Sequence, residues 1–500
     1  MPAPLVCGPV PPRAVFVPPP PRPVRRRQPK VRASLWIRLI WSCCLLAAVA
    51  FAYQQANQAV QPTYPKVWDP RVAPLIDFVQ HERGLTFKHP IRVDFLSDAD
   101  YVALFTKPAH EPSAAQRSGA AKASAVLDAA GLAKNYDALA GDATVMSVGT
   151  LGFYSFQQDR IVVRGDQLTP AVRVVLAHEL THALQAQHFH IVMGGADDLR
   201  LRSVVEADAM RVEAAYAKTL PKDEQQAAHS GNSITPGAKT SLDSVPAAVV
   251  DTTMAPYALG PLLVHDVFAQ RGNAGVDELL KSPPTEQVLI DPWSFATPVA
   301  ERTVTVKAPD GATVFEAPRT LSMFDTLLML DAWLPWTTAR GALDTWAGGG
   351  YVSYQRGGAK GRLCFTETAT FDGSPQPFVD AVRKWAKLAH TTAAPVVVGP
   401  DVTFESCQRG ATAAVPPEQV VDTVDAIVWE SLFISESKMA TTAENVRSLR
   451  CLSRIIVDDP STAPLVSKAR WTTKERAVYT YVRNANAHRC GLVVKASATP

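Results

Sequence analysis

The residues best suited to chemistry lie in the stretch AHELTHALQAQHFH, residues 177–190. His178 and His182 are four residues apart, so on a helix their imidazoles share one face and can bind one ion, an arrangement that suits Zn²⁺. Glu179 would then lie beside the ion and suit a general base that activates zinc-bound water. Because the chain has 11 His, an H-E-x-x-H pattern would arise by chance only on the order of 0.01 times. The pattern therefore predicts a zinc-binding helix.

A catalytic zinc also needs a third protein ligand and an open position for water. Glu206 is the favoured ligand, because it follows His182 by 24 residues and falls on a second predicted helix, at about 199–220. A connection of about ten residues would bring that helix back across the first. Four other carboxylates remain as rivals: Asp197, Asp198, Asp208 and Glu213.

Other polar residues near the motif are interpreted either as hydrogen-bond partners of the metal ligands or as ordinary polar residues. Asp208 or Glu213 could accept a hydrogen bond from the second ring nitrogen of a ligand imidazole, which metal-bound histidines normally donate. His188 and His190 lie beyond the helix face shared by the two motif histidines, so we interpret them as ordinary polar residues.

The elements around the motif follow from hydrophobic periodicity and turn residues. Thr169-Pro170 predicts a helix start, which places the motif in mid-helix. Before it, residues 150–156 and 161–164 predict a β-hairpin around the polar QQDR turn. After it, residues 221–246 are rich in Pro, Gly, Ser and Asn and predict a long loop, and residues 255–281 predict a helix interrupted at Gly260-Pro261. Upstream, PLIDFVQHERGL predicts a helix and IRVDFLS a strand.

The later part of the chain mixes strands with amphipathic helices. Strands are predicted in ERTVTVKA, GYVSYQRG, GRLCFTETATF and APVVVG, and helices in PQPFVDAVRKWAKLA and PEQVVDTVDAIVWESLF. The predicted class is therefore α+β. We divide the globular region into a domain at 67–300, which holds the motif, and a C-terminal α+β region at 301–500.

The first 66 residues have a different composition. Residues 1–33 are rich in Pro and Arg and predict a disordered tail. Residues 34–53 are apolar apart from Arg38 and long enough to span a bilayer, and the basic residues before them predict a cytoplasmic N-terminus. A cleaved signal peptide is the alternative interpretation. Residues 54–66 are polar and predict a stalk, so the body would lie outside the membrane.

Charge and cysteine usage agree with an exported protein that does not bind nucleic acid. The net charge of +3 is small for 500 residues and its excess lies in the N-terminal tail, so no extended basic surface is predicted. The exported part would hold Cys364, Cys407, Cys451 and Cys490, which predict two disulfides in an oxidising compartment. Three connectivities are possible, and the sequential one pairs Cys364 with Cys407 and Cys451 with Cys490.

Together, H-E-x-x-H and a following helical Glu resemble the gluzincin clan of zinc metallopeptidases, which includes the thermolysin-like enzymes. The strings RIVVRG, LTPAVRVVLAHELTHALQAQHF and VVEADA resemble a narrower, poorly characterised group of single-pass membrane-anchored bacterial proteins in that clan. The likeness covers about residues 67–410 and is strongest between 150 and 215. Thermolysin-like enzymes have an Asp four residues after the ligand Glu, whereas this chain has Met210.

The resemblance implies a zincin-like domain, one Zn²⁺ per chain held by His178, His182 and Glu206, and a polypeptide substrate. Glu179 would take a proton from the bound water and pass it to the leaving amine, while Tyr257 or His265 would stabilise the oxyanion. The outer strand of the hairpin would hold the substrate as an added strand. The expected function is that of a membrane-anchored zinc peptidase acting outside the cytoplasmic membrane. The alternatives are an inactive zinc-holding surface protein and a helix that binds no metal.

Overall fold

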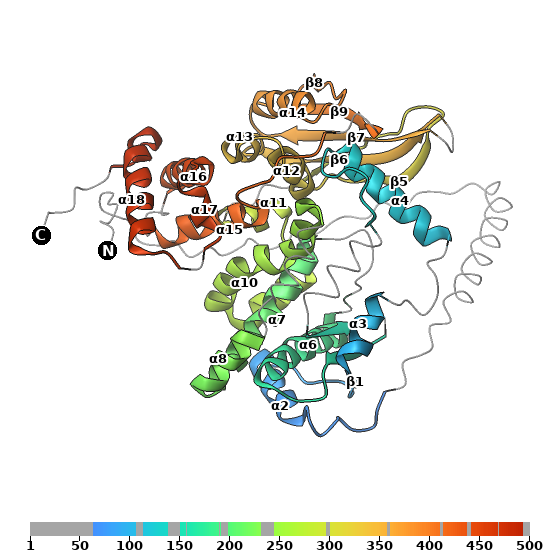
Figure 1. Cartoon of the computed structure of the whole chain (residues 1–500), viewed down its shortest axis with the longest axis vertical. Coiled ribbons are helices and arrows are strands. Elements are labelled where there is room, and N and C mark those ends of the chain that lie inside the picture. The colour runs from blue at the N-terminus through green and yellow to red at the C-terminus, as the bar shows by residue number, and fades with distance from the viewer. Residues whose placement is uncertain are drawn as a thin grey trace, which may run out of the picture. The chain divides into compact units, whose positions relative to one another are not determined.

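The computed structural model describes residues 64–106, 114–138, 151–156, 158–189, 191, 199–231, 245–296, 301–357, 361–410, 414–437, 442–468 and 470–493. The predicted tail and membrane span, residues 1–33 and 34–53, lie outside these residues, as does nearly all of the stalk. From Val67 onward the chain belongs to one compact unit. The predicted α+β class is confirmed, with two β-sheets and many helices (Figure 1).

The secondary-structure elements have the following bounds. The α-helices are α2 (Ala73–Arg83), α3 (Asp98–Thr106), α4 (Ala114–Ala129), α6 (Pro170–Phe189), α7 (Leu199–Thr219), α8 (Lys222–Gly231), α10 (Ala247–Lys281), α11 (Glu286–Ile290), α12 (Met323–Asp331), α13 (Trp336–Gly341), α14 (Gln376–Leu388), α15 (Thr423–Glu436), α16 (Ala443–Asp458), α17 (Ala463–Val466) and α18 (Thr473–Ala487). The strands are β1 (Arg92–Leu96), β2 (Gly152–Ser155), β3 (Arg160–Arg164), β4 (Arg302–Thr303), β5 (Thr313–Thr320), β6 (Trp346–Arg356), β7 (Arg362–Phe371), β8 (Val396–Val398) and β9 (Asp401–Cys407).

A small sheet supports the helix that carries the motif. Its order is β1-β3-β2, with β1 parallel and β2 antiparallel to β3, so the predicted hairpin is confirmed and β2 lies at an edge. Ile161 and Val163 of β3 pack with Leu176 and Leu180 of α6 in one buried cluster, to which α2 also contributes. Because α6 packs on this sheet and on α7, most of its residues are buried.

Helices α7 and α10 cross at a point where no side chain fits between them. A Cβ atom at Gly260 would lie 2.0 Å from the carbonyl oxygen of Ser203 and 2.8 Å from the Cβ of Ala207. The predicted interruption at Gly260-Pro261 is therefore wrong: the chain stays helical there because the glycine permits the crossing. The helix starts at Ala247, and its non-helical residue is Gly272, with φ of 61°.

Helix α10 also has the length and composition of a membrane span. Among the described residues it is the one helix that is long and apolar enough to cross a bilayer. It contributes Leu259, Leu263 and Val267 to the largest core cluster and packs against α7 and α15. The buried carboxyl of Asp251 lies in its first turns.

The larger sheet has the order β4-β6-β7-β9-β8, with β5 also paired to β6. One face, which includes Phe365 of β7 and Phe404 of β9, packs in the largest core cluster with residues from α4, α12 and α14. The same cluster includes Val205 of α7 and Leu289 of α11, so its residues come from both sides of residue 300. The larger sheet and α7 thus share one core.

The four cysteines after residue 300 form two disulfides with the sequential connectivity. Cys364 and Cys407 face each other on neighbouring strands β7 and β9. Cys451 of α16 is bonded to Cys490, just after α18. The prediction of two disulfides is confirmed.

Two local predictions are wrong. Residues 222–231, expected to belong to a long loop, form α8, because KDEQQAAHSG combines strong helix formers with Asp223 and Glu224 in the first turn. Residues 232–244 lie outside the described residues. The strand expected in 301–308 is reduced to the two residues of β4, which pair with Gly348 and Gly349 of β6.

The α7–α10 crossing predicts the effect of adding one methyl group. Gly260→Ala should destabilise the protein by about 1–3 kcal/mol, because the backbone of α7 must move away. Gly119→Ala is the matched control, since a Cβ there meets nothing within 4 Å and the glycine lies inside α4. The control should stabilise by about 0.5–1 kcal/mol. Thermal unfolding of both variants measures the difference, and equal shifts would contradict the close crossing.

Two buried carboxyls join α10, α12 and α15. Asp251 accepts a hydrogen bond from the backbone N–H of Thr423, at the start of α15, and Asp331 accepts one from the Thr423 hydroxyl. Burial, with the nearby charges of Asp422 and Asp331, raises the pKa of Asp251 to about 8. Burial raises the pKa of Asp331 to about 7, although hydrogen bonds from Thr423 and Gln419 act to lower it.

These shifts predict that stability falls as pH rises from about 4 to 8. The unfolded carboxyls release their protons near pH 4, whereas in the folded protein Asp331 keeps its proton up to about pH 7 and Asp251 up to about pH 8, so within these windows each contributes a loss of at most about 1.4 kcal/mol per pH unit. Asp331→Asn should flatten the pH dependence of the unfolding free energy, measured by urea titration at pH 5 and pH 8. Asp310→Asn, an exposed control, should leave the slope unchanged. An unaltered slope in Asp331→Asn would contradict the assignment.

Candidate metal centre

Helix α6 begins where the sequence predicts. Pro170 is its first residue, and the hydroxyl of Thr169 accepts a hydrogen bond from the backbone N–H of Val172. The motif therefore falls in mid-helix, between the small sheet and α7. Both His178 and His182 are buried, and so is Glu206 on the facing side of α7.

The three predicted ligands meet. The Nε2 atoms of His178 and His182 are 3.0 Å apart, and each lies 3.2 Å from Oε2 of Glu206. The two imidazole rings lie edge to face, with centroids 4.6 Å apart. Three potential ligand atoms thus form a small triangle inside the protein.

The partners of the two Nδ1 atoms show which ring nitrogens carry hydrogen. Nδ1 of His178 lies 3.0 Å from Oε2 of Glu213, and Nδ1 of His182 lies 3.0 Å from Oε1 of Gln185. A carboxylate and an amide oxygen only accept hydrogen bonds, so both Nδ1 atoms are the donors. In the neutral rings both Nε2 atoms then carry lone pairs directed at each other and at Glu206.

The orientation of the Gln185 amide is set by its own partners. Its Nε2 donates to the carbonyl oxygen of Val205, at 3.1 Å, and to Oδ2 of Asp208, at 2.8 Å. Asp208 is fully buried and ion-paired with Arg83, with 2.9 Å between Oδ2 and Nε. Oε1 of Gln185 must therefore face His182. Asp208 therefore supports the site through Gln185, whereas Glu213 contacts His178 directly. This refines the prediction that either carboxylate could accept a hydrogen bond from an imidazole.

The triangle is therefore a site that could hold a metal ion. With both rings neutral, two lone pairs and one carboxylate oxygen face one another with no hydrogen between them, an arrangement that a central cation would stabilise. The identity of the ion does not follow from the donor atoms alone.

The charges of the cluster shift its pKa values strongly. Burial disfavours the charged form of His178, but hydrogen bonds to Glu206 and Glu213 outweigh it and raise the pKa well above the ordinary value. Burial acts to raise the pKa of Glu206, but the two imidazoles reverse this and hold it well below the usual range. The centre therefore favours positive charge beside the Glu206 carboxylate.

Glu179 lies at the junction of the cluster and the small sheet. Its Oε2 accepts a hydrogen bond of 2.7 Å from the backbone N–H of Tyr154, so the outer edge of β2 faces the site. Burial raises the pKa of this carboxyl above its ordinary value, although the two neighbouring imidazoles act to lower it. The group is thus a stronger base than an exposed glutamate.

The two predicted oxyanion residues lie in different places. Burial together with the nearby charges of Glu206 and Glu179 raises the pKa of Tyr257 well above the ordinary value. Its hydroxyl therefore remains a proton donor. His265 is exposed and lines a separate apolar cavity, whose lining includes none of the three cluster residues.

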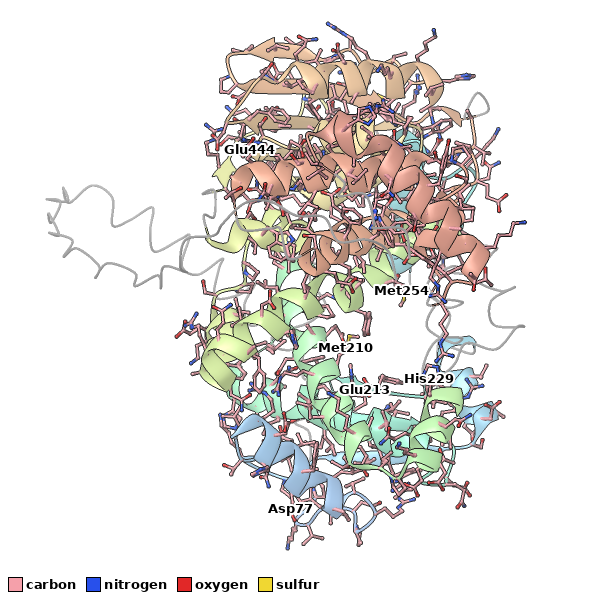
Figure 2. All side chains as sticks on the ribbon, turned by 90° about the vertical axis from the view of Figure 1, so that its left-hand side faces the viewer. Asp77, Met210, Glu213, His229, Met254 and Glu444 are labelled. Atoms are coloured by element: carbon pink, nitrogen blue, oxygen red, sulfur yellow. A yellow bond between two sulfur atoms is a disulfide. The ribbon has the colours of Figure 1, made fainter. Side chains whose placement is uncertain are left out.

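The other candidates fall outside the centre. Asp197 and Asp198 lie outside the described residues, as does His190. His188 lies 2.8 Å from the carbonyl oxygen of Thr86, through Nε2, which agrees with its interpretation as an ordinary polar residue. Met210 lies on α7, and Glu213, three residues further along the same helix, contacts Nδ1 of His178 (Figure 2).

No protein-family model matches this chain. No curated protein and no solved structure matches it either. The resemblance to gluzincins therefore remains an expectation, and the argument for function rests on the geometry of the centre.

Sequence reasoning missed Gln185 and the backbone N–H of Tyr154. The spacing of Gln185, three residues after His182, places it next to that imidazole on the helix surface and would have identified it. No sequence signal identifies the Tyr154 contact, because it depends on how the hairpin packs against α6.

Removing the amide that orients His182 should weaken metal binding. Gln185→Leu leaves Nδ1 of His182 without its acceptor, so affinity for Zn²⁺ or Co²⁺ should fall about 10- to 100-fold. Gln187→Leu is the control, because Gln187 is a buried amide on the same helix that contacts residues 88 and 89 instead of the cluster. Competition with a chromophoric chelator measures both, and equal affinities in the two variants would contradict the hydrogen-bond assignment.

Proposed function

We propose that this protein is a zinc-dependent peptidase. The observation that carries the proposal is the convergence of two imidazole lone pairs and one carboxylate oxygen beside a second carboxylate, Glu179, at the edge of a β-sheet. Each component has a defined use in peptide hydrolysis, and the four residues come from only two helices.

The geometry of the cluster suits zinc. A tetrahedral ion with ligands at about 2.0–2.1 Å places neighbouring ligand atoms about 3.3 Å apart. The three observed separations are 3.0, 3.2 and 3.2 Å. Two His and one Glu also form a donor set used by catalytic zinc sites, which leave a fourth position open. His178, His182 and Glu206 would therefore hold the ion.

The protein's own residues supply the proton transfers. When bound, zinc contributes Lewis acidity, which polarises a carbonyl group and makes water more acidic. Glu179 is placed to accept a proton from water and to deliver it to the leaving amine. The N–H of Tyr154 orients this carboxylate. Tyr257, whose raised pKa keeps its hydroxyl protonated, would donate a hydrogen bond to the developing oxyanion.

The small sheet would position the substrate. Strand β2 is the edge strand, and the N–H of Tyr154 shows that its outer side faces Glu179. An extended peptide added along this edge would bring its backbone to the general base. Such pairing makes little demand on side chains, so specificity would have to come from elsewhere in the protein.

The proposal includes a location outside the cytoplasmic membrane. Residues 34–53 supply the apolar segment for an anchor, and the basic residues before it favour a cytoplasmic N-terminus. The two disulfides support an oxidising environment for the folded part.

The experiment separates metal binding from catalysis. Glu179→Gln in the full chain should bind zinc as the parent does, because Glu179 is not a ligand, but should lose at least about 100-fold in the rate of hydrolysis of denatured proteins. Glu278→Gln, an exposed control on α10, should retain full activity. Metal analysis and release of peptides measure the two properties.

Two results would contradict the proposal. Zinc without turnover in the parent would fit an inactive zinc-holding surface protein. Equal activity in the parent and in Glu179→Gln would remove this carboxyl from the mechanism.

A further inference from the structure

A second feature of the molecule is a cavity of about 730 Å³, which is lined in part by α7 and α10. Its wall is formed by α4, by the N-terminal turns of α7 and α10, by β5 and α12, and by the core face of β6 and β7. A cavity of this size can hold a small ligand or several side chains.

The cavity shares two helices with the metal centre. Arg202 and Thr253 line it, and they lie four residues before Glu206 and Tyr257 respectively. Four residues of helix rise about 6 Å, so each of these lining residues lies about one helical turn from a residue at the centre. A substrate whose backbone lies at the cluster could therefore extend a side chain into this space.

The charges in the wall are unbalanced. Five carboxylates line the cavity, against three guanidinium groups. The carboxylates are Glu286, Glu301, Glu316, Asp325 and Glu367. The guanidinium groups belong to Arg200, Arg202 and Arg319; Arg200 lies 3.5 Å from Glu301, and Arg319 lies 3.9 Å from Asp325. Acidic side chains therefore outnumber basic ones in the wall.

One of these carboxyls is buried with an unused oxygen. Glu367 is 5% exposed, and among the described residues its Oε2 has no hydrogen-bond partner. It projects from β7 opposite Tyr351 of β6, on the face that lines the cavity. A buried carboxyl without a partner is costly, so this oxygen indicates a ligand that would satisfy it.

Burial disfavours the charged form of two of these carboxyls, and a bound cation would favour it again. Burial raises the pKa of Glu367 to about 8, with a further contribution from Asp325 and an opposing one from Arg319. Burial, with the charges of Asp325 and Glu301, raises the pKa of Glu286 to about 7, although hydrogen bonds from Phe324 and Ser322 oppose it. Glu316 and the guanidinium groups of Arg200 and Arg202 also line the cavity.

The apolar part of the wall suits a long basic side chain. Phe315, Phe365 and Tyr351 line the cavity with several aliphatic residues. Two of these rings already receive cations, because the ammonium group of Lys122 lies 4.7 Å from the centre of Phe315 and the guanidinium of Arg319 lies 4.4 Å from that of Tyr351. Lys and Arg combine an apolar stem with a charged end, so both parts would find partners.

We propose that this cavity is a specificity pocket, which binds a Lys or Arg side chain of a polypeptide whose backbone lies at the metal centre. Glu367 pairs with the cationic end at the base of the pocket, and the aromatic residues cover the stem. The proposal rests on the proposed peptidase function for the placement of the backbone. The basic preference follows from the cavity itself.

Binding to an inactive chain tests the pocket without requiring turnover. The zinc-loaded full chain carrying Glu179→Gln is titrated with fluorescent peptides that differ at one position, which is Lys, Arg, norleucine or Glu. The Lys and Arg peptides should bind at least about tenfold more tightly than the other two, since the paired charge is desolvated. Adding Glu367→Gln should remove this preference while leaving the norleucine peptide unchanged.

The control is Glu405→Gln, which makes the same change on the opposite face of the same sheet, where Glu405 pairs with Arg356. This variant should keep the preference. Free butylamine lacks a peptide backbone, so it should not displace the Lys peptide when it is added at the concentration at which that peptide saturates its site. Effective competition by butylamine would show a small-amine site and overturn the peptide proposal.

The outcomes separate the two proposals. Basic preference in the binding assay, with no hydrolysis by the parent, would keep the pocket and overturn the peptidase. Hydrolysis by the parent with equal binding of all four peptides would do the reverse. Absence of binding by every peptide, or a preference that survives Glu367→Gln in a chain with unaltered thermal unfolding, would also overturn the pocket.

Discussion

Two imidazole nitrogens and one carboxylate oxygen held within 3.2 Å of one another inside a protein repel each other unless a proton or another cation lies between them. This constraint organises the N-terminal half of the fold. The helices α6 and α7 must approach closely enough to bring Glu206 to the two imidazoles, and a second layer of hydrogen bonds must stop the rings from rotating apart. Glu213 restrains His178 and Gln185 restrains His182. These hydrogen bonds hold both imidazole rings in the orientation that a metal ion would require.

The second layer is itself anchored in a wider network. Asp208 binds Gln185 and pairs with Arg83 of α2, and Arg83 in turn binds Asn273 and Asp277 of α10. Asn273 follows the non-helical Gly272, so the bend in α10 turns a side chain toward α2, where its amide also donates to the carbonyl oxygen of Glu82. Four helices are thus linked through buried polar contacts to the orientation of one imidazole.

The sequence predicted the local parts of this arrangement well. The helical spacing of His178 and His182 was sufficient to predict that their imidazoles share one face. The short connection to the next amphipathic helix was sufficient to predict that Glu206 lies opposite them. The structure brings the three metal-binding candidates together as expected. It also confirms the hairpin, which was predicted from two strand-like runs around a polar turn. The two disulfides, predicted from four cysteines, are confirmed as well.

Contacts between distant segments were not predictable in the same way. Glycine and proline predict a break at residues 260–261, yet the helix continues because tight packing on α7 needs a residue without a side chain there. The cavity combines α4, α7, α10, α12 and three strands, so no single stretch of sequence contains its signal. Glu367 in particular is one acidic residue in an otherwise ordinary strand pattern.

The distribution of cysteine has a consequence for any metal ion that the site binds. No cysteine lies between Cys44 and Cys364, and the four that follow are joined in pairs. If reduced, these four thiols would be softer donors than the imidazoles and would compete with the site for a thiophilic ion. The two bridges remove that competition, so an ion entering the folded protein would meet imidazole and carboxylate donors.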